Sequence, residues 1–518
     1  MNRFALIFLS TVALLGHTTT AGKAQVVGTT AAEEFEEEDV IFLEPDAEAP
    51  TEAQPTFIEP VVPEDILDEQ TEDDVPADDS TVEQESEEAP ATASYIEQFN
   101  TGLDAYRDRN DEAAIEAFNA SITLNPDYPP AYLFRGAAFA RLDNTAAALD
   151  NYNQAIVINP DYSAAYLNRG ILYYDQNEID LATEDFDRAI ATDPDGSVAY
   201  IYRGLIASEQ DNQQIALEYL NDAIRLDPNN ASAYFHRGLV FKSLNNPESA
   251  ISDFTQAINL KDDYTEAFLN RGVAYYRIDA MTEALDDFNQ AIELDDTNVE
   301  AYYNRSFVLR AQNRPQAAVA DLNQVLSLDA SNARAYLNRG QIYAASGNTV
   351  AAISDLSKVL ELSPESAEAY YRRGTAYLQT AEQQAAIADF TAALALDPEH
   401  APSYKGRGDA FANLGDGFSA LGDYSTAIDL DSTYWSAYAS RGRMFYEAAD
   451  YQSAYTDFSS VIRANVLDAD VFYYRGITNA RLGNMGRAAV DLEKAGSLYL
   501  TNNEATRYRL VLDALNQL

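Results

Sequence analysis

Residues 333–366 read ARAYLNRGQIYAASGNTVAAISDLSKVLELSPES, and this stretch decides the fold. Two segments within it, 336–345 and 351–362, have apolar residues at three- and four-residue spacing, which predicts two short amphipathic helices. The Ser-Gly-Asn sequence at 346–348 is typical of a tight turn between them. Pro364 ends the second helix, because proline lacks an N–H group and disfavours helix in the residue before it. The stretch therefore predicts a helix–turn–helix hairpin.

The same pattern returns thirty-four residues later, where residues 367–400 read AEAYYRRGTAYLQTAEQQAAIADFTAALALDPEH. Counted from Tyr95, twelve units of this length follow one another without insertion or deletion and end at Asn502. We number the positions within each unit as places one to thirty-four. Place eight is Gly or Ser and place twenty is Ala in every unit, while place four is aromatic in units two to twelve. Small side chains let two helices approach closely, and the aromatic side chain fills the space against the next hairpin.

This period and pattern resemble the tetratricopeptide repeat (TPR) family, and the resemblance covers residues 95–502. It implies an all-α fold, a right-handed α-solenoid superhelix of stacked helix–turn–helix repeats. The first helix of each pair is then expected to line a concave groove. The resemblance also implies a non-enzymatic binding and scaffolding module, and it leaves the identity of the bound partner open.

Residues 503–518 follow the last unit and carry apolar residues at Tyr508, Leu512 and Leu515. A repeat array needs a terminal element with a polar outer face to cover its last hydrophobic edge. We therefore predict a C-terminal capping helix here, with a docking helix for a partner as the alternative.

The N-terminus has the pattern of a secretory signal peptide. Arg3 is followed by an apolar run from Phe4 to Gly16 and then by small residues, with cleavage expected after Ala24 or after Ala21. The run is too short for a comfortable membrane span, although an uncleaved anchor is the alternative. Residues 1–24 therefore predict export, to the periplasm or the medium, most simply of a bacterium.

Residues 25–94 differ sharply in composition from the rest of the chain. Between residues 31 and 90 there are 24 Asp and Glu and no Lys or Arg, with seven prolines. Such a segment repels itself and buries too little apolar surface to offset chain ordering, so we expect it to be disordered. Apolar islands around Phe42 and Phe57 are either incidental or short docking motifs, for another protein or for this chain's own groove.

Composition excludes several classes of function. The net charge of −50 argues against nucleic acid or an anionic membrane as the main partner, since both need a basic face. There is no Cys, and the three His are scattered, so no disulfide, metal site or cofactor is expected. No motif with catalytic spacing stands out, and we expect no enzyme activity.

Charged residues recur in register along the units. Place seven is Arg in units two to twelve, and place twenty-three is Asp in nine units. We interpret this as a structural ladder of Arg–Asp pairs, such as Arg339 with Asp355 and Arg373 with Asp389. A row of arginines that binds anions is the alternative.

The resemblance places the groove at places two, five, nine, twelve and thirteen. Its acidic members, such as Asp409, nearly balance its basic members, such as Lys405 and Arg443, while place five adds a largely apolar row that must partly pack in the core. A near-neutral groove with aromatic and arginine side chains suits a peptide of mixed character. The residues predicted to bind the partner are Tyr303, Arg310, Tyr371, Arg277, Lys242, Arg141, Tyr276, Phe235 and Tyr473.

Unit ten departs from the others because it contains Gly415, Gly417 and Gly422, and each Gly costs a helix about 1 kcal/mol relative to Ala. We expect its second helix to be short or frayed. Its turn could alternatively lie at Gly422–Asp423.

Two functions follow from the sequence. The first is an exported interaction scaffold that holds a peptide or protein in its groove, with the acidic segment as a possible intramolecular ligand. The alternative is a structural or accessory subunit of an envelope assembly or secretion complex.

Overall fold

The computed structural model describes residues 94–518. The signal peptide and the acidic segment predicted above lie outside the described residues, apart from Ser94. This residue precedes the first helix and caps it, because its hydroxyl accepts from the backbone N–H of Glu97.

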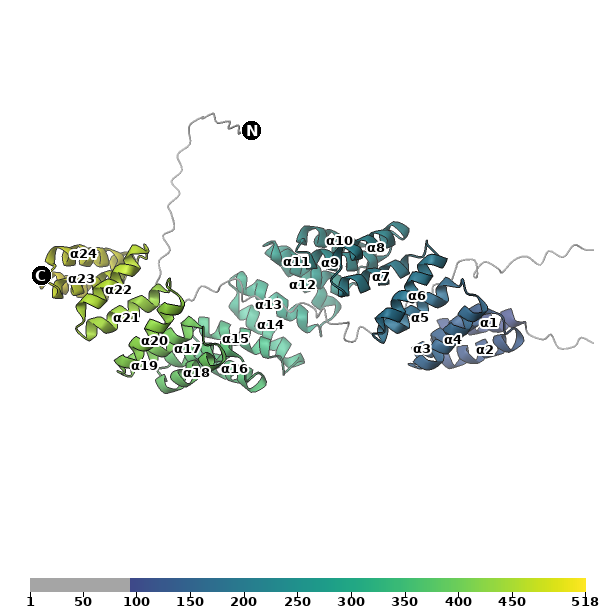
Figure 1. Cartoon of the computed structure of the whole chain (residues 1–518), viewed down its shortest axis with the longest axis horizontal. Coiled ribbons are helices and arrows are strands. Elements are labelled where there is room, and N and C mark those ends of the chain that lie inside the picture. The colour runs from purple at the N-terminus through teal and green to yellow at the C-terminus, as the bar shows by residue number, and fades with distance from the viewer. Residues whose placement is uncertain (1–93) are drawn as a thin grey trace, which may run out of the picture. The chain divides into compact units, whose positions relative to one another are not determined.

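The described chain divides into two compact units, residues 94–332 and residues 333–518 (Figure 1). The first unit contains α1 (Tyr95–Arg107), α2 (Asp111–Leu124), α3 (Pro129–Arg141), α4 (Thr145–Ile158), α5 (Ser163–Asp175), α6 (Ile179–Thr192), α7 (Ser197–Glu209), α8 (Gln213–Leu226), α9 (Ala231–Ser243), α10 (Pro247–Leu260), α11 (Thr265–Arg277), α12 (Met281–Leu294), α13 (Val299–Ala311) and α14 (Pro315–Leu328). The second unit contains α15 (Ala333–Ala345), α16 (Thr349–Leu362), α17 (Ala367–Gln379), α18 (Gln383–Leu396), α19 (Ala401–Asn413), α20 (Gly417–Leu430), α21 (Trp435–Glu447), α22 (Tyr451–Arg463), α23 (Ala469–Arg481), α24 (Met485–Thr501) and α25 (Ala505–Asn516).

Within each unit the helices stack in chain order. Each odd-numbered helix packs on the even-numbered helix that follows it, as α17 does on α18, and the second helix of a pair then packs on the next pair, as α18 does on α19. Residues 94–518 contain no strand. The predicted all-α class of stacked helix–turn–helix repeats is therefore confirmed.

The small residue at place eight has a direct packing reason. A Cβ atom added to Gly272 would lie 2.8 Å from Cε1 of Phe288, the fully buried residue at place twenty-four of the same repeat. The other glycines at place eight in residues 94–518 face an aromatic or leucine side chain at place twenty-four in the same way. Ala284, at place twenty, is also fully buried. In the eleven hairpins with glycine at place eight, the two helices therefore approach through a glycine and an alanine, and the aromatic or leucine side chain fills the remaining space.

The turn inside each hairpin has a residue with a left-handed backbone at place fifteen. The residue is Asn, Asp, Arg or Ala in nine repeats, and it is Gly347, Gly415 or Gly483 in the other three. Left-handed backbone is least strained for glycine. Gly415, with a φ of 82°, therefore suits its turn rather than disturbing it.

In unit ten the expected shortening of the second helix is therefore wrong, and so is the alternative position of its turn. Its second helix, α20, has 14 residues, as many as α16 in unit eight. Its turn lies before Gly417 and not at Gly422–Asp423, because Asp423 is in mid-helix and pairs with Arg407. Neighbouring repeats hold the register, and two of the three glycines lie in the turn or at the first helical position, where glycine costs little.

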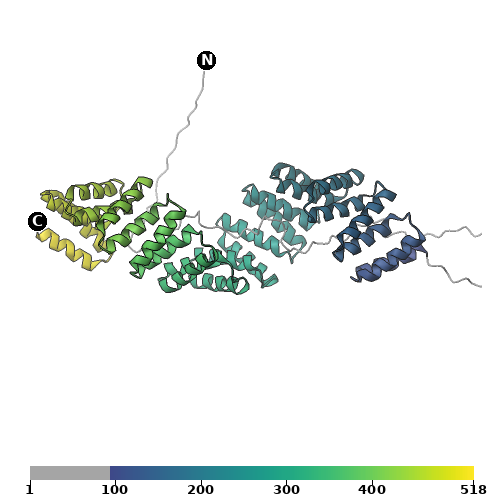
Figure 2. The same cartoon turned by 60° about the horizontal axis from the view of Figure 1, so that its bottom comes forward.

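The last helix, α25, packs against α24 and is the yellow helix nearest the C label in Figure 2. It buries Val511 against α24, while Leu510 and Leu512 remain 50% and 41% exposed. Arg507 forms an ion pair with Asp470 of α23 at 2.8 Å. Among the helices that the structure describes, none is long and apolar enough to cross a lipid bilayer.

Candidate binding groove

The arginine at place seven joins the two helices of its own repeat. Arg373 on α17 donates from Nε and Nη2 to the two carboxylate oxygens of Asp389 on α18, both at 2.8 Å. The hydrogen bonds to Asp389 raise the pKa of Arg373. All nine Arg–Asp pairs expected from the register are present. They include Arg339 with Asp355, and their carboxylates are buried or nearly so.

The same arginine also reaches back to the preceding repeat. Nη1 of Arg373 donates to the hydroxyl of Ser357, at place twenty-five on α16, at 3.0 Å. Arg169 binds Asn153 and Arg271 binds Thr255 in the same way. The sequence analysis overlooked place twenty-five, although its signal was available, since a polar residue occupies this place in every unit.

Aromatic rings complete the surroundings of these arginines. The guanidinium carbon of Arg373 lies 5.8 Å from the ring centroids of Tyr370 and Tyr377, at places four and eleven. The Arg373 side chain thus ties together two consecutive second helices and two aromatic rings. This engagement favours the structural interpretation of the ladder over a free row that binds anions.

Three of the predicted groove residues lie in the core instead. Tyr303 is 2% exposed and Phe235 is 9% exposed. Arg141 is also buried, with its Nε bound to Asp111 at 2.8 Å and its Nη2 donating to the carbonyl of Tyr106. These three predictions are corrected. Sequence spacing places a side chain on the groove side of a helix, but it does not show whether a neighbouring repeat covers that side, as the preceding repeat covers Arg141.

The other predicted residues keep some exposed surface. Lys242 is partly buried and donates to Asn270 at 3.0 Å, and Arg310 lies over the ring of Phe307. Arg277 is exposed. The remaining three, which are Tyr276, Tyr371 and Tyr473, are partly buried.

The first helices of repeats nine, ten and eleven form a cavity of about 440 Å³, which we call the α17–α21 groove. The places that line it are largely those assigned to the groove by the family resemblance. Its lining residues are Tyr371, Thr375, Leu378 and Gln379 of α17, Pro402, Lys405, Gly406, Asp409 and Asn413 of α19, and Tyr434, Ser440 and Arg443 at or on α21.

A charged network crosses the floor of this groove. Lys405 donates to Asp409 at 2.7 Å, and the hydroxyl of Tyr424 donates to the other carboxylate oxygen at 2.8 Å. Burial alone would lower the pKa of Lys405, but the adjacent Asp409 outweighs this effect, so the pKa is raised. Burial and the same carboxylate raise the pKa of Tyr424. Asp409 thus already has Lys405 as an ion-pair partner and Tyr424 as a hydrogen-bond donor.

Arg443 is the available charge in the groove. It is exposed and forms no hydrogen bond or ion pair among residues 94–518. Asn413 and Gln379 add amide groups, and Tyr371 and Leu378 add an apolar wall. The His400 ring lies edge-on to Tyr371 at 4.8 Å and holds the tyrosine in place. The sequence counted Lys405, Asp409 and Arg443 among the groove charges, but nothing in their spacing singled them out.

The groups in this groove are of the kinds that contact bound peptides. An arginine without a partner can accept a carboxylate, amide side chains can bind a peptide backbone, and the tyrosine–leucine wall can hold an apolar side chain. In the part of the chain that the structure describes, no group of three or more His, Asp or Glu is placed to hold a metal ion.

Comparison with known families gives matches to helical repeats. Family models described as "TPR repeat" match residues 144–177, 308–347 and 340–380. Those described as "Tetratricopeptide repeat" match residues 163–195, 367–400, 235–299, 439–496 and 288–320. Together they cover more than half of the chain. Residues 214–244 also match the "Protein prenyltransferase alpha subunit repeat", over little more than α8, a turn and α9.

Solved structures show likeness in fold at low identity. The Cut9–Hcn1 hetero-tetramer of the APC/C is 12% identical, with 82% of this chain and 96% of that chain covered and a TM-score of 0.43. Yeast Tom70 is 16% identical, with 82% and 96% covered and a TM-score of 0.35. YrrB, described as a TPR protein with an unusual peptide-binding site, is 23% identical, with 36% and 97% covered and a TM-score of 0.33. No curated protein matches the chain.

Proposed function

Because the chain belongs to the tetratricopeptide repeat family, whose members are typically non-catalytic scaffolds, we propose that it is an interaction scaffold that binds a peptide or protein in its concave groove. The observation that carries the proposal is the α17–α21 groove. It presents the unpaired Arg443 and a tyrosine–leucine wall within one cavity of about 440 Å³. A cavity of this size holds a few side chains of a peptide.

The proposed ligand is a peptide segment with a carboxylate beside an apolar residue. The carboxylate pairs with Arg443, while the apolar residue lies on Tyr371 and Leu378. Lys405 is less available because Asp409 holds it, so its part is to fix the floor of the groove.

The test compares capture of proteins by the immobilised mature chain and by two variants. Arg443→Ala removes the available charge. Arg463→Ala is the matched control, since it removes an exposed arginine whose side chain, among residues 94–518, binds only Ser459 and Ser460 of its own helix α22. We expect one client to be lost with Arg443→Ala and retained with Arg463→Ala. A client retained equally by both variants contradicts the proposed site.

The same experiment separates the alternative function. A structural or accessory subunit of an envelope assembly would co-purify with large subunits in fixed stoichiometry, and the loss of one groove charge would not release them. A single short client sensitive to Arg443→Ala supports the groove instead.

We further propose that the protein acts outside the cytoplasm, in the periplasm or the medium of a bacterium. The support is the short apolar run of residues 4–16 and the small residues before Gln25. Mass spectrometry of the native protein tests this proposal. A mature N-terminus at Gln25 or Gly22 is expected, and an intact Met1 contradicts it.

The acidic segment supplies a second candidate ligand for the groove. It combines 24 acidic residues between positions 31 and 90 with apolar islands at Phe42 and Phe57, and it is tethered to the first repeat. A tether of this kind gives an effective concentration on the order of mM, so even a weak contact would be populated. Binding of the client to the full mature chain and to a chain beginning at Thr92 is compared at low and high salt. Tighter binding after the deletion, most clearly at low salt, is expected. Unchanged affinity at both salt concentrations refutes the contact.

A further inference from the structure

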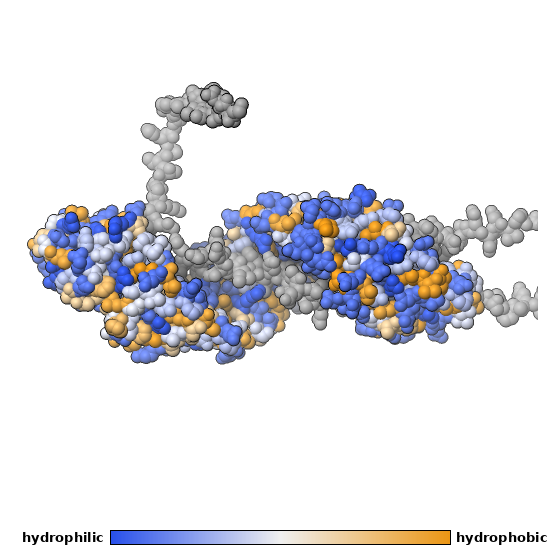
Figure 3. All heavy atoms as spheres, viewed as in Figure 1, coloured by the Kyte–Doolittle hydropathy of each residue, from blue (hydrophilic) through white to orange (hydrophobic). Residues whose placement is uncertain are grey.

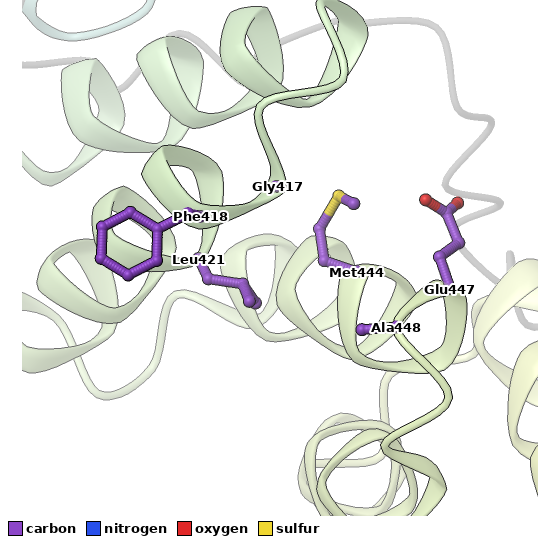
Figure 4. Close-up of a pocket in the computed structure, with 6 residues that line it drawn as sticks. All are labelled: Gly417, Phe418, Leu421, Met444, Glu447 and Ala448. Carbon is purple, nitrogen blue, oxygen red and sulfur yellow. The ribbon is translucent and has the colours of Figure 1, made fainter.

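A second cavity, of about 460 Å³, lies where α20 begins and α21 ends. It shares no lining residue with the α17–α21 groove. Its lining is almost entirely apolar and consists of Gly417, Phe418, Leu421, Met444, Glu447 and Ala448. In Figure 4, Phe418 and Leu421 come from one helix, Met444 and Glu447 come from the other, and Ala448 follows directly after its end. We call this surface the Phe418 hollow.

Phe418 breaks the pattern of the array itself. It occupies place eighteen, which is polar in eight repeats, small in two and valine in one. The residues at this place in the other repeats are Glu112, Ala146, Asp180, Gln214, Glu248, Thr282, Gln316, Val350, Gln384, Gln452 and Gly486. Stacking of the repeats therefore does not require an aromatic residue here.

The phenylalanine does not contribute to the core of its own chain. Phe418 is 91% exposed, the highest value among the large hydrophobic side chains of residues 94–518. The preceding residue, Gly417, has no side chain, and a Cβ there would meet only the Met444 methyl group at 3.8 Å. The Phe418 ring stands at the rim, and Gly417 has no side chain to fill the space beside it. The result is an apolar depression that is open to solvent. Contiguous exposed apolar surface of this kind typically marks an interaction site.

Charge decides what can occupy the hollow. Glu447 lines it and forms no ion pair among residues 94–518. Asp416 and Asp450 stand in the adjacent turns, where each caps the helix that follows. These three carboxylates outnumber Arg443, which lies one turn before Glu447 on α21, so the rim is acidic on balance. A second copy of this chain, with a net charge of −50, and its own segment 31–90, which has no Lys or Arg, both carry the wrong charge.

From these observations we infer that the Phe418 hollow docks a segment of a partner protein that carries an apolar side chain flanked by lysine or arginine. The apolar side chain enters the depression between Leu421 and Met444 and stacks against Phe418. The basic side chains pair with Glu447 and the aspartates of the neighbouring turns. The site is separate from the groove, so one chain can hold two partners at once.

The test measures binding of three fluorescein-labelled peptides of equal length to the full mature chain. One has a Phe-Leu pair flanked by lysines, the second has the same pair flanked by glutamates, and the third has lysines with the pair replaced by serines. The proteins compared are the wild type, Phe418→Gln and Val350→Gln. The last is the matched control, because Val350 occupies the same place in repeat eight and is 76% exposed. Both substituted side chains lie at the surface, so both variants keep the fold, which circular dichroism verifies.

We expect the lysine-flanked Phe-Leu peptide to bind at least about tenfold tighter than either of the other two. Phe418→Gln is expected to weaken this binding by about tenfold or more, whereas Val350→Gln leaves it within about twofold. The proposed groove is tested by client capture with Arg443→Ala, and this inference by peptide binding with Phe418→Gln, so failure of the one and failure of the other give different results.

Several outcomes overturn the inference. They are absence of binding at about 1 mM chain, equal binding of the lysine- and glutamate-flanked peptides, and no effect of Phe418→Gln. Loss of binding with Arg443→Ala would place the peptide in the groove instead. Analytical ultracentrifugation tests whether a second copy of the chain occupies the hollow instead. A wild-type dimer that becomes monomeric with Phe418→Gln would assign the hollow to that second copy.

Discussion

Two glycines in repeat ten should respond in opposite ways to the same substitution. Gly408 lies within α19 and Gly422 within α20, so in both cases alanine replaces glycine in a helix interior. At Gly408 a Cβ atom would lie 2.8 Å from Cε1 and 3.0 Å from Cδ1 of Tyr424. At Gly422, which is exposed, nothing lies within 4 Å of the added atom.

The expected magnitudes follow from these distances. Alanine stabilises an exposed helix interior relative to glycine by about 1 kcal/mol, which is the whole expected effect of Gly422→Ala. Gly408→Ala gains the same amount but must displace the Tyr424 ring, and overpacking of this kind costs about 1–3 kcal/mol. Tyr424 is fully buried and donates to Asp409 at 2.8 Å, so it cannot move away freely. We therefore expect Gly408→Ala to destabilise repeat ten by about 0–2 kcal/mol, which leaves it about 1–3 kcal/mol less stable than Gly422→Ala.

Native-state amide exchange of the full mature chain is the appropriate assay, because long arrays do not unfold in a single two-state step. The opening free energy of α19 and α20 is compared among the wild type and the two variants. Gly422→Ala also tests whether glycine makes α20 soft, since the wild-type segment 413–424 should exchange faster than segment 345–356 of unit eight. Equal stability of the two variants would refute the argument from close packing at place eight.

Further predictions concern buried charges and export. Arg373→Ala or Asp389→Ala alone should destabilise the neighbouring helices by about 3–5 kcal/mol, whereas Arg373→Met with Asp389→Leu should cost much less, as amide exchange would report. Burial lowers the pKa of His236 to about 4 from a reference of 6.5. The histidine is therefore neutral when folded but charged when unfolded below pH 6.5, so stability present above pH 6.5 falls as the pH drops towards 4, by up to about 2 kcal/mol at pH 5. His236→Asn should remove this loss, and urea unfolding of both proteins at two pH values measures it. A mature chain beginning at Gln25 or Gly22, detected by mass spectrometry, remains the prediction for export.

The sequence predicted the helices of the array almost without error, and the reason is physical. The same pattern of small and apolar residues occurs in all twelve repeats, so each repeat supports the helix positions predicted for the others. Helix α15, for example, was expected over Tyr336–Ala345 and is found over Ala333–Ala345. The failure came in repeat ten, where intrinsic helix propensity argued for a short second helix. There the fixed length of the repeat and the packing of Tyr424 on Gly408 determine the register, and both outweigh the weak preferences of Gly417 and Gly422.

The groove was less predictable because burial depends on the neighbouring repeat. Tyr303 and Tyr371 are both tyrosines at place five of their repeats. Tyr303 is nevertheless only 2% exposed, whereas Tyr371 helps to line the α17–α21 groove. A pattern within one unit cannot report how closely the next first helix packs.

The arginine at place seven shows what the array gains from charge in its interior. A buried ion pair contributes little net stability, because desolvation of both partners offsets their attraction. Such a pair nevertheless demands a particular alignment, since Arg407 must meet Asp423 within its own repeat and the hydroxyl of Thr391 in the preceding one. A slip of one helix by a turn would leave the buried carboxylate unpaired, at a cost of several kcal/mol. If the repeats were held together by apolar contacts alone, such a slip would cost much less free energy, because alanine and leucine side chains pack almost equally well after a shift of one helical turn. We infer that the ladder fixes the register between consecutive repeats, which in turn keeps the α17–α21 groove and the Phe418 hollow in their positions on the surface.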